Sequence, residues 1–167
     1  GEVLVTHEAG SSYTDAGAIA VDVVDGNLSE EVDVVSTVDV SKPGSYTVSY
    51  GVSDSAGNNA RVVIRKVTVE DTRGPVITLK GEALVTHEVG GSYKDDGASA
   101  TDMVDGDLTS KIVVTGAVDT SAVGTYTLKY DVSDAAGNAA ESLGRTVVVE
   151  KTTVEKTTVV QTLDLEV

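Results

Sequence analysis

The chain has 167 residues, 40% of them apolar, a length and composition suited to one or two small globular domains. Acidic residues outnumber basic ones by 27 to 12, which gives a formal charge of −15, and Lys and Arg form no cluster, so nucleic acid and anionic membranes are excluded as partners. No apolar run approaches the roughly 20 residues that cross a bilayer, so we expect no membrane insertion.

The chain contains no cysteine. An acidic sequence rich in Thr and Val that folds without disulfides is typical of bacterial secreted or surface proteins, although cysteine-free cytosolic proteins are also common. There is no Trp or Phe, so the core must be built from aliphatic residues and six tyrosines. We predict an extracellular or cell-surface location.

An internal repeat organises the sequence. Residues 1–70 align with residues 81–150 without a gap, and 38 of the 70 positions are identical. A period of 80 is too long for a solenoid unit and suits a small domain. The repeat therefore predicts one domain over residues 1–71, a second over residues 72–150, and a tail over residues 151–167.

Within each unit, short runs rich in β-branched residues alternate with Gly, Asp, Asn and Ser turns. In the first unit the predicted strands cover residues 5–7, 18–23, 31–38, 44–53 and 60–70. No segment has a sustained apolar stripe of helical period, so we expect essentially no helix. The pattern predicts an all-β chain of two tandem immunoglobulin-like Greek-key β-sandwiches without disulfides.

The stretch over residues 123–133 is the clearest predicted strand. Tyr126, Leu128, Tyr130 and Val132 alternate with polar residues, which is the period of 2 that a half-buried strand requires. We therefore expect these four side chains in the core, with residues 134–138 forming the turn that follows.

Two tyrosines occupy a position with a known structural role in immunoglobulin sandwiches. There, a Tyr near the start of strand F, two residues before a disulfide Cys, bonds to nearby backbone. Tyr46 and Tyr126 fit this position, with Val48 and Leu128 where the Cys would be. Packing is thus predicted to replace the disulfide.

The two units differ at their ends. Residues 74–80 precede the second copy and predict a first strand, with Pro75 at its permitted start. The first unit begins at Gly1, so we expect its equivalent strand to be missing. In the tail, Leu163, Leu165 and Val167 alternate with polar residues. The tail is either a linker or an edge strand, within residues 159–167, through which molecules self-associate.

Several motifs of the second unit point to a known family. They are SYKDDGASATD at residues 92–102, VDGDLT at 104–109, the run from Gly-Thr-Tyr to Asn over 124–138, and RTVVV at 145–149. In this order they resemble the bacterial surface-protein Ig-like domain family, which includes Ig-like repeats of some pesticidal crystal proteins. The resemblance covers nearly all of both units. It implies spacer and adhesive modules whose partners are neighbouring domains of the same protein and a cell-surface protein or glycan.

Acidic and amide side chains gather in two loops of each unit. They are Asp102, Asp105, Asp107, Asp134 and Asn138 in the second unit, and Asp22, Asp25, Asn27, Asp54 and Asn58 in the first. In an immunoglobulin sandwich these loops share a pole, and the interdomain linker with Asp71 arrives there. Clustered oxygens are what Ca²⁺ needs, so one prediction is a calcium site as the only cofactor. The other is turn chemistry alone, with Asp and Asn capping their own backbone.

Nothing in the sequence predicts catalysis. His7 and His87 recur with the repeat, lack a Cys or second His to complete a zinc site, and have no nucleophile motif beside them. We predict a non-catalytic structural and adhesive module. The alternative is a pair of carbohydrate-binding accessory domains of a secreted polysaccharide-degrading enzyme, with Tyr13 and Tyr93 contacting sugar rather than packing beneath a loop.

Overall fold

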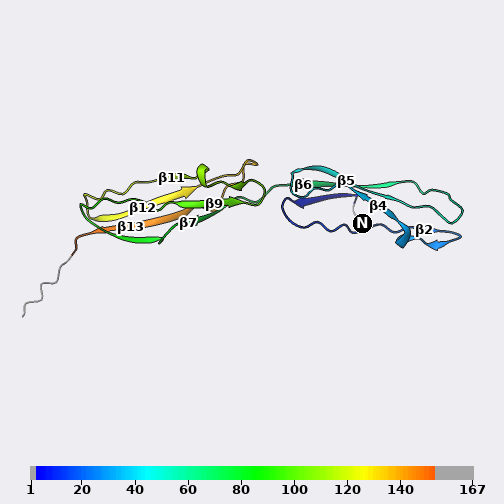
Figure 1. Ribbon diagram of the computed structural model, residues 1–167, viewed down its shortest axis with the longest axis horizontal. Helices are drawn as coiled ribbons and strands as arrows, with labels where there is room; N and C mark the ends of the chain where they lie inside the picture. Colours follow the sequence, from blue (N-terminus) through cyan, green and yellow to red (C-terminus); the bar gives the residue numbers. More distant parts are fainter. Residues whose placement is uncertain (1–2, 153–167) are drawn as a thin grey trace, which may run out of the picture.

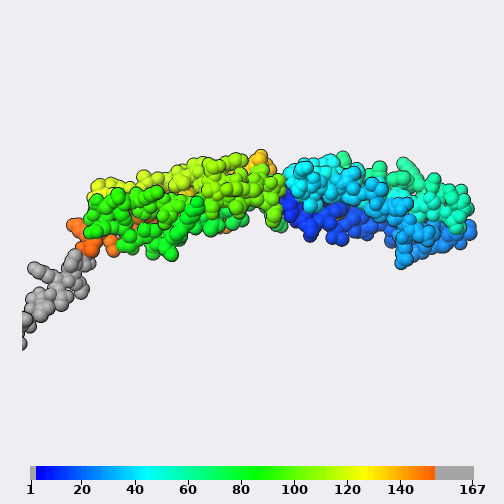
Figure 2. Space-filling view, viewed as in Figure 1, coloured from blue at the N-terminus to red at the C-terminus, as the bar shows by residue number. Residues whose placement is uncertain are grey.

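A computed structural model of the protein describes residues 3–152. Its two β domains follow each other end to end and give an elongated molecule (Figures 1 and 2). The strands of domain 1 lie within residues 3–70, those of domain 2 lie within residues 76–150, and residues 71–75 link them. Across the described range there is no α-helix, only two single 3₁₀ turns. The proposed edge strand over residues 159–167 lies outside the described residues.

Domain 1 is built mainly on one sheet of four strands. Its elements are β1 (Leu4–Glu8), β2 (Val21–Asp22), β3 (Gly26–Asn27), the 3₁₀ turn η1 (Ser29–Glu31), β4 (Asp33–Ser36), β5 (Gly44–Gly51) and β6 (Val63–Glu70). The sheet order is β1-β6-β5-β4, in which β1 and β6 run parallel and the other pairs antiparallel. Strands β2 and β3 form a separate short ribbon.

Domain 2 repeats this plan and adds a second complete sheet. Its elements are β7 (Val76–Leu79), β8 (Leu84–Glu88), β9 (Ala98–Asp102), β10 (Gly106–Asp107), η2 (Thr109–Lys111), β11 (Val113–Thr115), β12 (Gly124–Asp131) and β13 (Leu143–Glu150). One sheet has the order β11-β12-β13-β8 and the other β10-β9-β7. The all-β sandwich predicted from the alternating pattern is thus confirmed.

The core of domain 2 lies between its two sheets. Leu128, Tyr130 and Val132 are buried there with Ile77 of β7, and Tyr126 is half-buried at the start of β12. The alternation of β12 explains this, because side chains two residues apart leave the same face of a strand. The buried face predicted from the sequence is therefore the buried face of the structure.

Both tyrosines at the start of the F-type strand make the expected backbone hydrogen bond. The Tyr46 hydroxyl donates to the Lys42 carbonyl at 2.8 Å, and the Tyr126 hydroxyl donates to the Ala122 carbonyl at 3.0 Å. Two residues further on, Val48 and Leu128 are buried in the two domain cores. Apolar packing fills the space that a disulfide occupies in other sandwiches of this type.

The predicted strand over residues 18–23 was too long. In domain 1 only Val21–Asp22 pair as a strand, whereas the equivalent residues of domain 2 form all of β9. The physical reason is the partner: β7 pairs with β9 from Val76 opposite Thr101 to Leu79 opposite Ala98. Within residues 3–152, no strand occupies the corresponding position beside residues 18–21.

Candidate functional site

The linker between the domains lies against a turn of domain 2. Gly74 passes so close to the Ala139 carbonyl that an added β-carbon would overlap it. The side-chain amide of Asn138 donates to the main-chain oxygen of Asp71 at 3.0 Å. The turn over residues 134–138, which joins β12 to β13, thus holds the linker by its backbone.

The same linker is also fixed to domain 1. The backbone amide of Thr72 donates to the Glu8 carboxylate at 3.1 Å, and the Thr72 hydroxyl donates to its other oxygen. These hydrogen bonds lower the pKa of Glu8, because they stabilise its charged form. Glu8 ends β1, so the linker is attached on both sides.

Apolar residues complete the junction. Val104 of domain 2 packs against the core cluster of domain 1, in which Ala9 is buried. Met103 lies over Gly10, where a β-carbon would overlap its Cγ. Gly10 has φ +74°, a conformation that Gly adopts without steric cost. The domains therefore contact through side chains as well as through the linker.

Three carboxylates converge at this junction. Asp71 of the linker, Asp102 at the end of β9 and Asp134 of the β12–β13 turn present oxygen atoms that all lie within 4.8 Å of one another. Asp134 is buried, and the other two are half-buried. Burial raises the pKa of Asp71, and the neighbouring charges of Asp102, Asp134 and Glu8 raise it further.

No basic residue of the described range forms an ion pair with this acidic cluster (Asp71, Asp102 and Asp134). Three carboxylates so close repel one another, and each prefers a cation or a proton nearby. Carboxylate oxygens are also the ligands that calcium prefers. Chemically, the cluster is suited to holding a hard divalent cation between two domains.

Two members of the cluster also perform turn chemistry. Asp102 accepts hydrogen bonds from the amides of Val104 and Asp105 at 2.7 and 2.9 Å. Asp134 accepts from the Asn138 backbone at 2.7 Å and side chain at 2.9 Å. Burial would raise the pKa of Asp134, but these bonds outweigh it and the pKa is lowered. Asp102 and Asp134 therefore cap backbone amides of their own loops and also belong to the acidic cluster.

The structure does not bring the other predicted acids of domain 2 into this cluster. Asp105 accepts a hydrogen bond from the Ala135 amide at 2.6 Å and thereby joins the two loops. Asp107 accepts from the Thr109 amide at 2.9 Å at the start of η2. Both side chains therefore serve local structure.

In domain 1 the equivalent side chains make the same turns at the end of the domain that lies away from domain 2 (Figure 1). Asp22 caps the amides of Val24 and Asp25, Asp25 accepts from Ser55, Asn27 accepts from Ser29, and Asp54 accepts from Asn58. Among the residues that the structure describes, a grouping of three acids occurs only at the junction. The repeat thus supplies two matching loops but only one described junction.

The two tyrosines considered for sugar contact, Tyr13 and Tyr93, are packed against other side chains of their own domains. Tyr13 lies edge to face with His7, and Tyr93 with His87, with ring centroids 5.1 and 5.5 Å apart. Both rings are half-buried, and their hydroxyls donate to Asp15 and Asp95. Neither ring is therefore a fully exposed flat surface on which a sugar could stack.

The sequence analysis missed a buried ionic network in each domain. Arg65 and Arg145 are 5% and 1% exposed and bond to Asp15 and Asp95, respectively. Tyr50 and Tyr130 donate to the same carboxylates at 2.6 and 2.7 Å. A usable signal existed: each Arg shares its parity with the buried valines of its strand, and the Asp, Tyr and Arg recur with the repeat.

The network changes the acidity of its members. Burial opposes ionisation of Asp15, but hydrogen bonds from Tyr50 and Arg65 outweigh it and hold the pKa at about 2. Burial, followed by the bond to Asp15, raises the pKa of Tyr50 to about 12. The carboxylate is therefore charged and the phenol neutral over the physiological range.

Comparison with known proteins supports the fold. No curated protein matches the sequence. The chain is similar to a structure of the catalytic domain with the CBM51-1 and CBM51-2 domains of Clostridium perfringens ZmpB, at 15% identity and a TM-score of 0.58, over 90% of this chain and 30% of that one. It is also similar to a lipoprotein from Bacteroides thetaiotaomicron, at 26% identity and a TM-score of 0.43, over 48% and 40%.

The chain thus spans less than half the length of these two proteins. Within residues 3–152, no helix is long and apolar enough to cross a membrane. The model of the Ig-like domain of bacterial surface proteins matches residues 1–69 and again residues 77–149. Because these two matches take in well over half of the chain, the protein belongs to the family of bacterial surface-protein Ig-like domains and carries two tandem copies.

Proposed function

We propose that the chain is a non-catalytic spacer and adhesion module of an extracellular bacterial protein, in which a divalent cation, calcium by preference, stiffens the domain junction. The observation that carries this proposal is the convergence of Asp71, Asp102 and Asp134 where the linker meets two loops of domain 2. One acid belongs to the linker and two to domain 2, so an ion held by all three would fix the linker against domain 2. Because Thr72 of the linker is bonded to Glu8 of domain 1, this would also restrain domain 1.

The negative charges at the junction explain why a bound cation would stiffen it. Asp71 is held near Asp102 and Asp134 by the Asn138 bond to its carbonyl, and its pKa is raised first by burial and then by the repulsion of these two carboxylates. A bound cation removes this repulsion and restrains the linker. The protein would supply three carboxylates, and water the remaining ligands of the six to eight that calcium takes.

Calorimetric titration of the whole chain with Ca²⁺ and with Mg²⁺ tests the proposal. We expect heat of binding and a rise in Tm with Ca²⁺, a weaker response with Mg²⁺, and loss of both in Asp71→Asn. Asp54→Asn is the matched control, because Asp54 is the repeat equivalent of Asp134 at the pole where no third described acid gathers. If Ca²⁺ gives neither heat of binding nor a change in Tm, the proposed cation site is rejected.

The spacer function has its own measurement. Small-angle X-ray scattering should give a single extended particle whose maximum dimension matches two domains end to end. We expect Ca²⁺ to narrow the distribution of interdomain distances in the unmodified chain and to leave it unchanged in Asp71→Asn. A compact, collapsed particle would contradict a spacer.

The carbohydrate-binding alternative has less support, because Tyr13 and Tyr93 are half-buried and bonded to Asp15 and Asp95. A glycan array decides between the two functions. Binding that is lost in Tyr13→Ala or Tyr93→Ala, in a chain that still folds, would replace the spacer function by glycan recognition.

A further inference from the structure

The single methionine of the chain lies at the domain junction. Met103 follows Asp102, the last residue of β9, and its side chain lies over Gly10 of domain 1. A β-carbon on Gly10 would overlap the Met103 Cγ and would lie 3.4 Å from the Met103 sulfur. The thioether therefore rests on the backbone of the neighbouring domain.

The sulfur of Met103 is open to small reagents from solution. The residue is 73% exposed, although it also contacts domain 1. The chain has no cysteine, so Met103 carries its only sulfur atom. Peroxides convert exposed thioethers to methionine sulfoxide, which is polar where the thioether is apolar. The junction thus contains the atom of the chain that is most susceptible to mild oxidation.

The backbone on both sides of this contact offers little to a sulfoxide oxygen. The Gly10 amide already donates to the Val40 carbonyl at 2.7 Å. The amide of Val104, which follows Met103, already donates to the Asp102 carboxylate at 2.7 Å. A new acceptor that finds no donor in the protein keeps its hydrogen bonds with water. A sulfoxide at Met103 therefore favours solvent over the surface of Gly10.

We propose that Met103 is an oxidation site at which a neutral peroxide loosens the domain junction. The sulfur lone pair attacks one peroxide oxygen, so that an S–O bond forms and the O–O bond breaks. The proton on the transferred oxygen passes to the departing hydroxide, which leaves as water. Sulfur is oxidised by two electrons, and the peroxide is reduced. The polar side chain then leaves Gly10, and the two domains lose one of their direct contacts.

The charge of the surroundings selects the oxidant. Asp71, Asp102 and Asp134 gather at the same junction, and the chain as a whole has a formal charge of −15. A negative potential lowers the local concentration of anions but leaves that of neutral molecules unchanged. Neutral hydrogen peroxide therefore reaches Met103 more readily than an anionic oxidant of similar reactivity.

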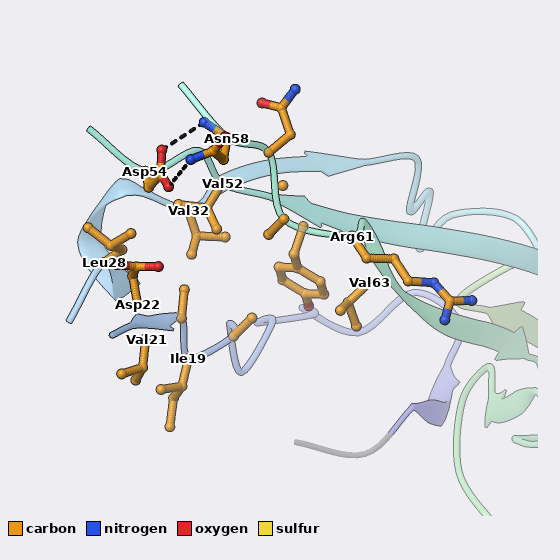
Figure 3. A pocket seen from close by; sticks show the side chains of 16 residues that line it. Ile19, Val21, Asp22, Leu28, Val32, Val52, Asp54, Asn58, Arg61 and Val63 are labelled. Atoms are coloured by element: carbon orange, nitrogen blue, oxygen red, sulfur yellow. Dashed lines mark hydrogen bonds between the residues drawn. The ribbon is translucent and has the colours of Figure 1, made fainter. Parts of the chain in front are cut away.

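Domain 1 supplies the same loop without the oxidisable atom. The equivalent of Met103 is Val23, in the loop that follows Val21 and Asp22, two residues that line an open pocket of domain 1 (Figure 3). Val23 is fully exposed and has no sulfur. The repeat thus provides an internal control position for the thioether.

The test treats the whole chain with hydrogen peroxide, with a chelator present so that the result is independent of the proposed cation. We expect a mass increase of about 16 Da at Met103. Hydrogen exchange of residues 102–105 should accelerate about fourfold, the factor that corresponds to uncovering one methylene group. Methionine sulfoxide reductases should restore the original exchange. Complete oxidation with unchanged exchange would overturn the proposal.

Two variants separate this contact from general effects of peroxide. Met103→Leu keeps an apolar side chain over Gly10 and cannot be oxidised there, so its exchange should not respond to peroxide. Val23→Met in the Met103→Leu background moves the thioether to the control position. Its oxidation should leave the exchange of residues 102–105 unchanged. Acceleration equal to that of the unmodified chain would show that contact with Gly10 is not the cause.

The preference for a neutral oxidant has a separate readout. The rate of Met103 oxidation is measured with hydrogen peroxide and with the peroxymonosulfate anion, at low and at high salt. Because salt screens the negative potential, we expect the rate with the anion to rise with salt and the rate with hydrogen peroxide to stay constant. An anion rate that does not change with salt would contradict selection by charge.

Discussion

The side-chain amide of Asn138 donates a hydrogen bond of 3.0 Å to the main-chain oxygen of Asp71, across 67 positions of sequence. It also donates to Asp134 at 2.9 Å, as Asn58 donates to Asp54 at 2.7 Å in domain 1. The same residue of the repeat therefore closes a turn in both domains and, in domain 2, also holds the linker.

Asn138→Ala should loosen the junction. The substitution removes the side-chain bonds to Asp71 and Asp134 and leaves the backbone bonds of the turn, and we expect domain 2 to lose about 1 kcal/mol of stability. Scattering should show a broader distribution of interdomain distances. Asn58→Ala is the control, because it opens the equivalent turn without touching the linker. Equal broadening in both variants would mean that Asn138 does not hold the linker.

Gly10→Ala should disturb the junction more than Gly90→Ala. Both residues have positive φ, +74° and +84°, so each substitution adds backbone strain of about 1 kcal/mol. A methyl group at Gly10 also overlaps Met103 of domain 2, whereas Gly90 has open space. Hydrogen exchange of residues 102–105 reports the difference, and we expect Met103→Ala to restore normal exchange to Gly10→Ala. Identical exchange in the two glycine variants would contradict the contact.

Acid should destabilise domain 1 through Asp15. Its pKa is about 2 when folded and about 3.8 ordinarily, so this contribution is complete above pH 5 and lost as pH falls from 4 towards 2. The shift corresponds to about 2 kcal/mol. Urea unfolding from pH 7 to 2.5 should lose this part of its pH dependence in Asp15→Asn and retain it in Asp33→Asn. An unchanged slope in Asp15→Asn would refute the prediction.

Arg145→Met should destabilise domain 2 severely. The substitution leaves the Asp95 carboxylate and the carbonyls of Glu82 and Gly97 without this buried donor, and breaking a buried ion pair costs about 3 to 5 kcal/mol. The control is Lys129→Ala, which removes the exposed pair with Asp131 and should leave urea unfolding almost unchanged. Comparable losses in the two variants would show that burial of Arg145 is unimportant.

Much of the fold follows from local pattern. The strand character of β12 and the tyrosine bonds at Tyr46 and Tyr126 depend on residues close in sequence, which alternation and turn chemistry describe directly. The pole where the loops meet was inferred from the sandwich topology, and the structure places Asp102 and Asp134 together there.

Other features depend on register between distant segments. The residues of the Arg145 network, Asp95 and Tyr130 among them, are 15 to 50 positions apart, and only the folded arrangement shows that they meet. Likewise, Asp102 and Asp105 belong to one acidic loop, yet only Asp102 reaches Asp71 because Asp105 is bonded to Ala135. The sequence alone does not show which of these two carboxylates faces Asp71.

The parallel pairing of β1 with β6 has a mechanical consequence. These strands pair from Leu4 opposite Lys66 to Glu8 opposite Glu70, and β8 pairs with β13 in the same way. When the chain is pulled from its two ends, β1 and β6 are drawn in opposite directions along their length. Their hydrogen bonds then resist tension together, in shear, rather than opening one after another. Each domain thereby resists force that is applied along the direction of these strands.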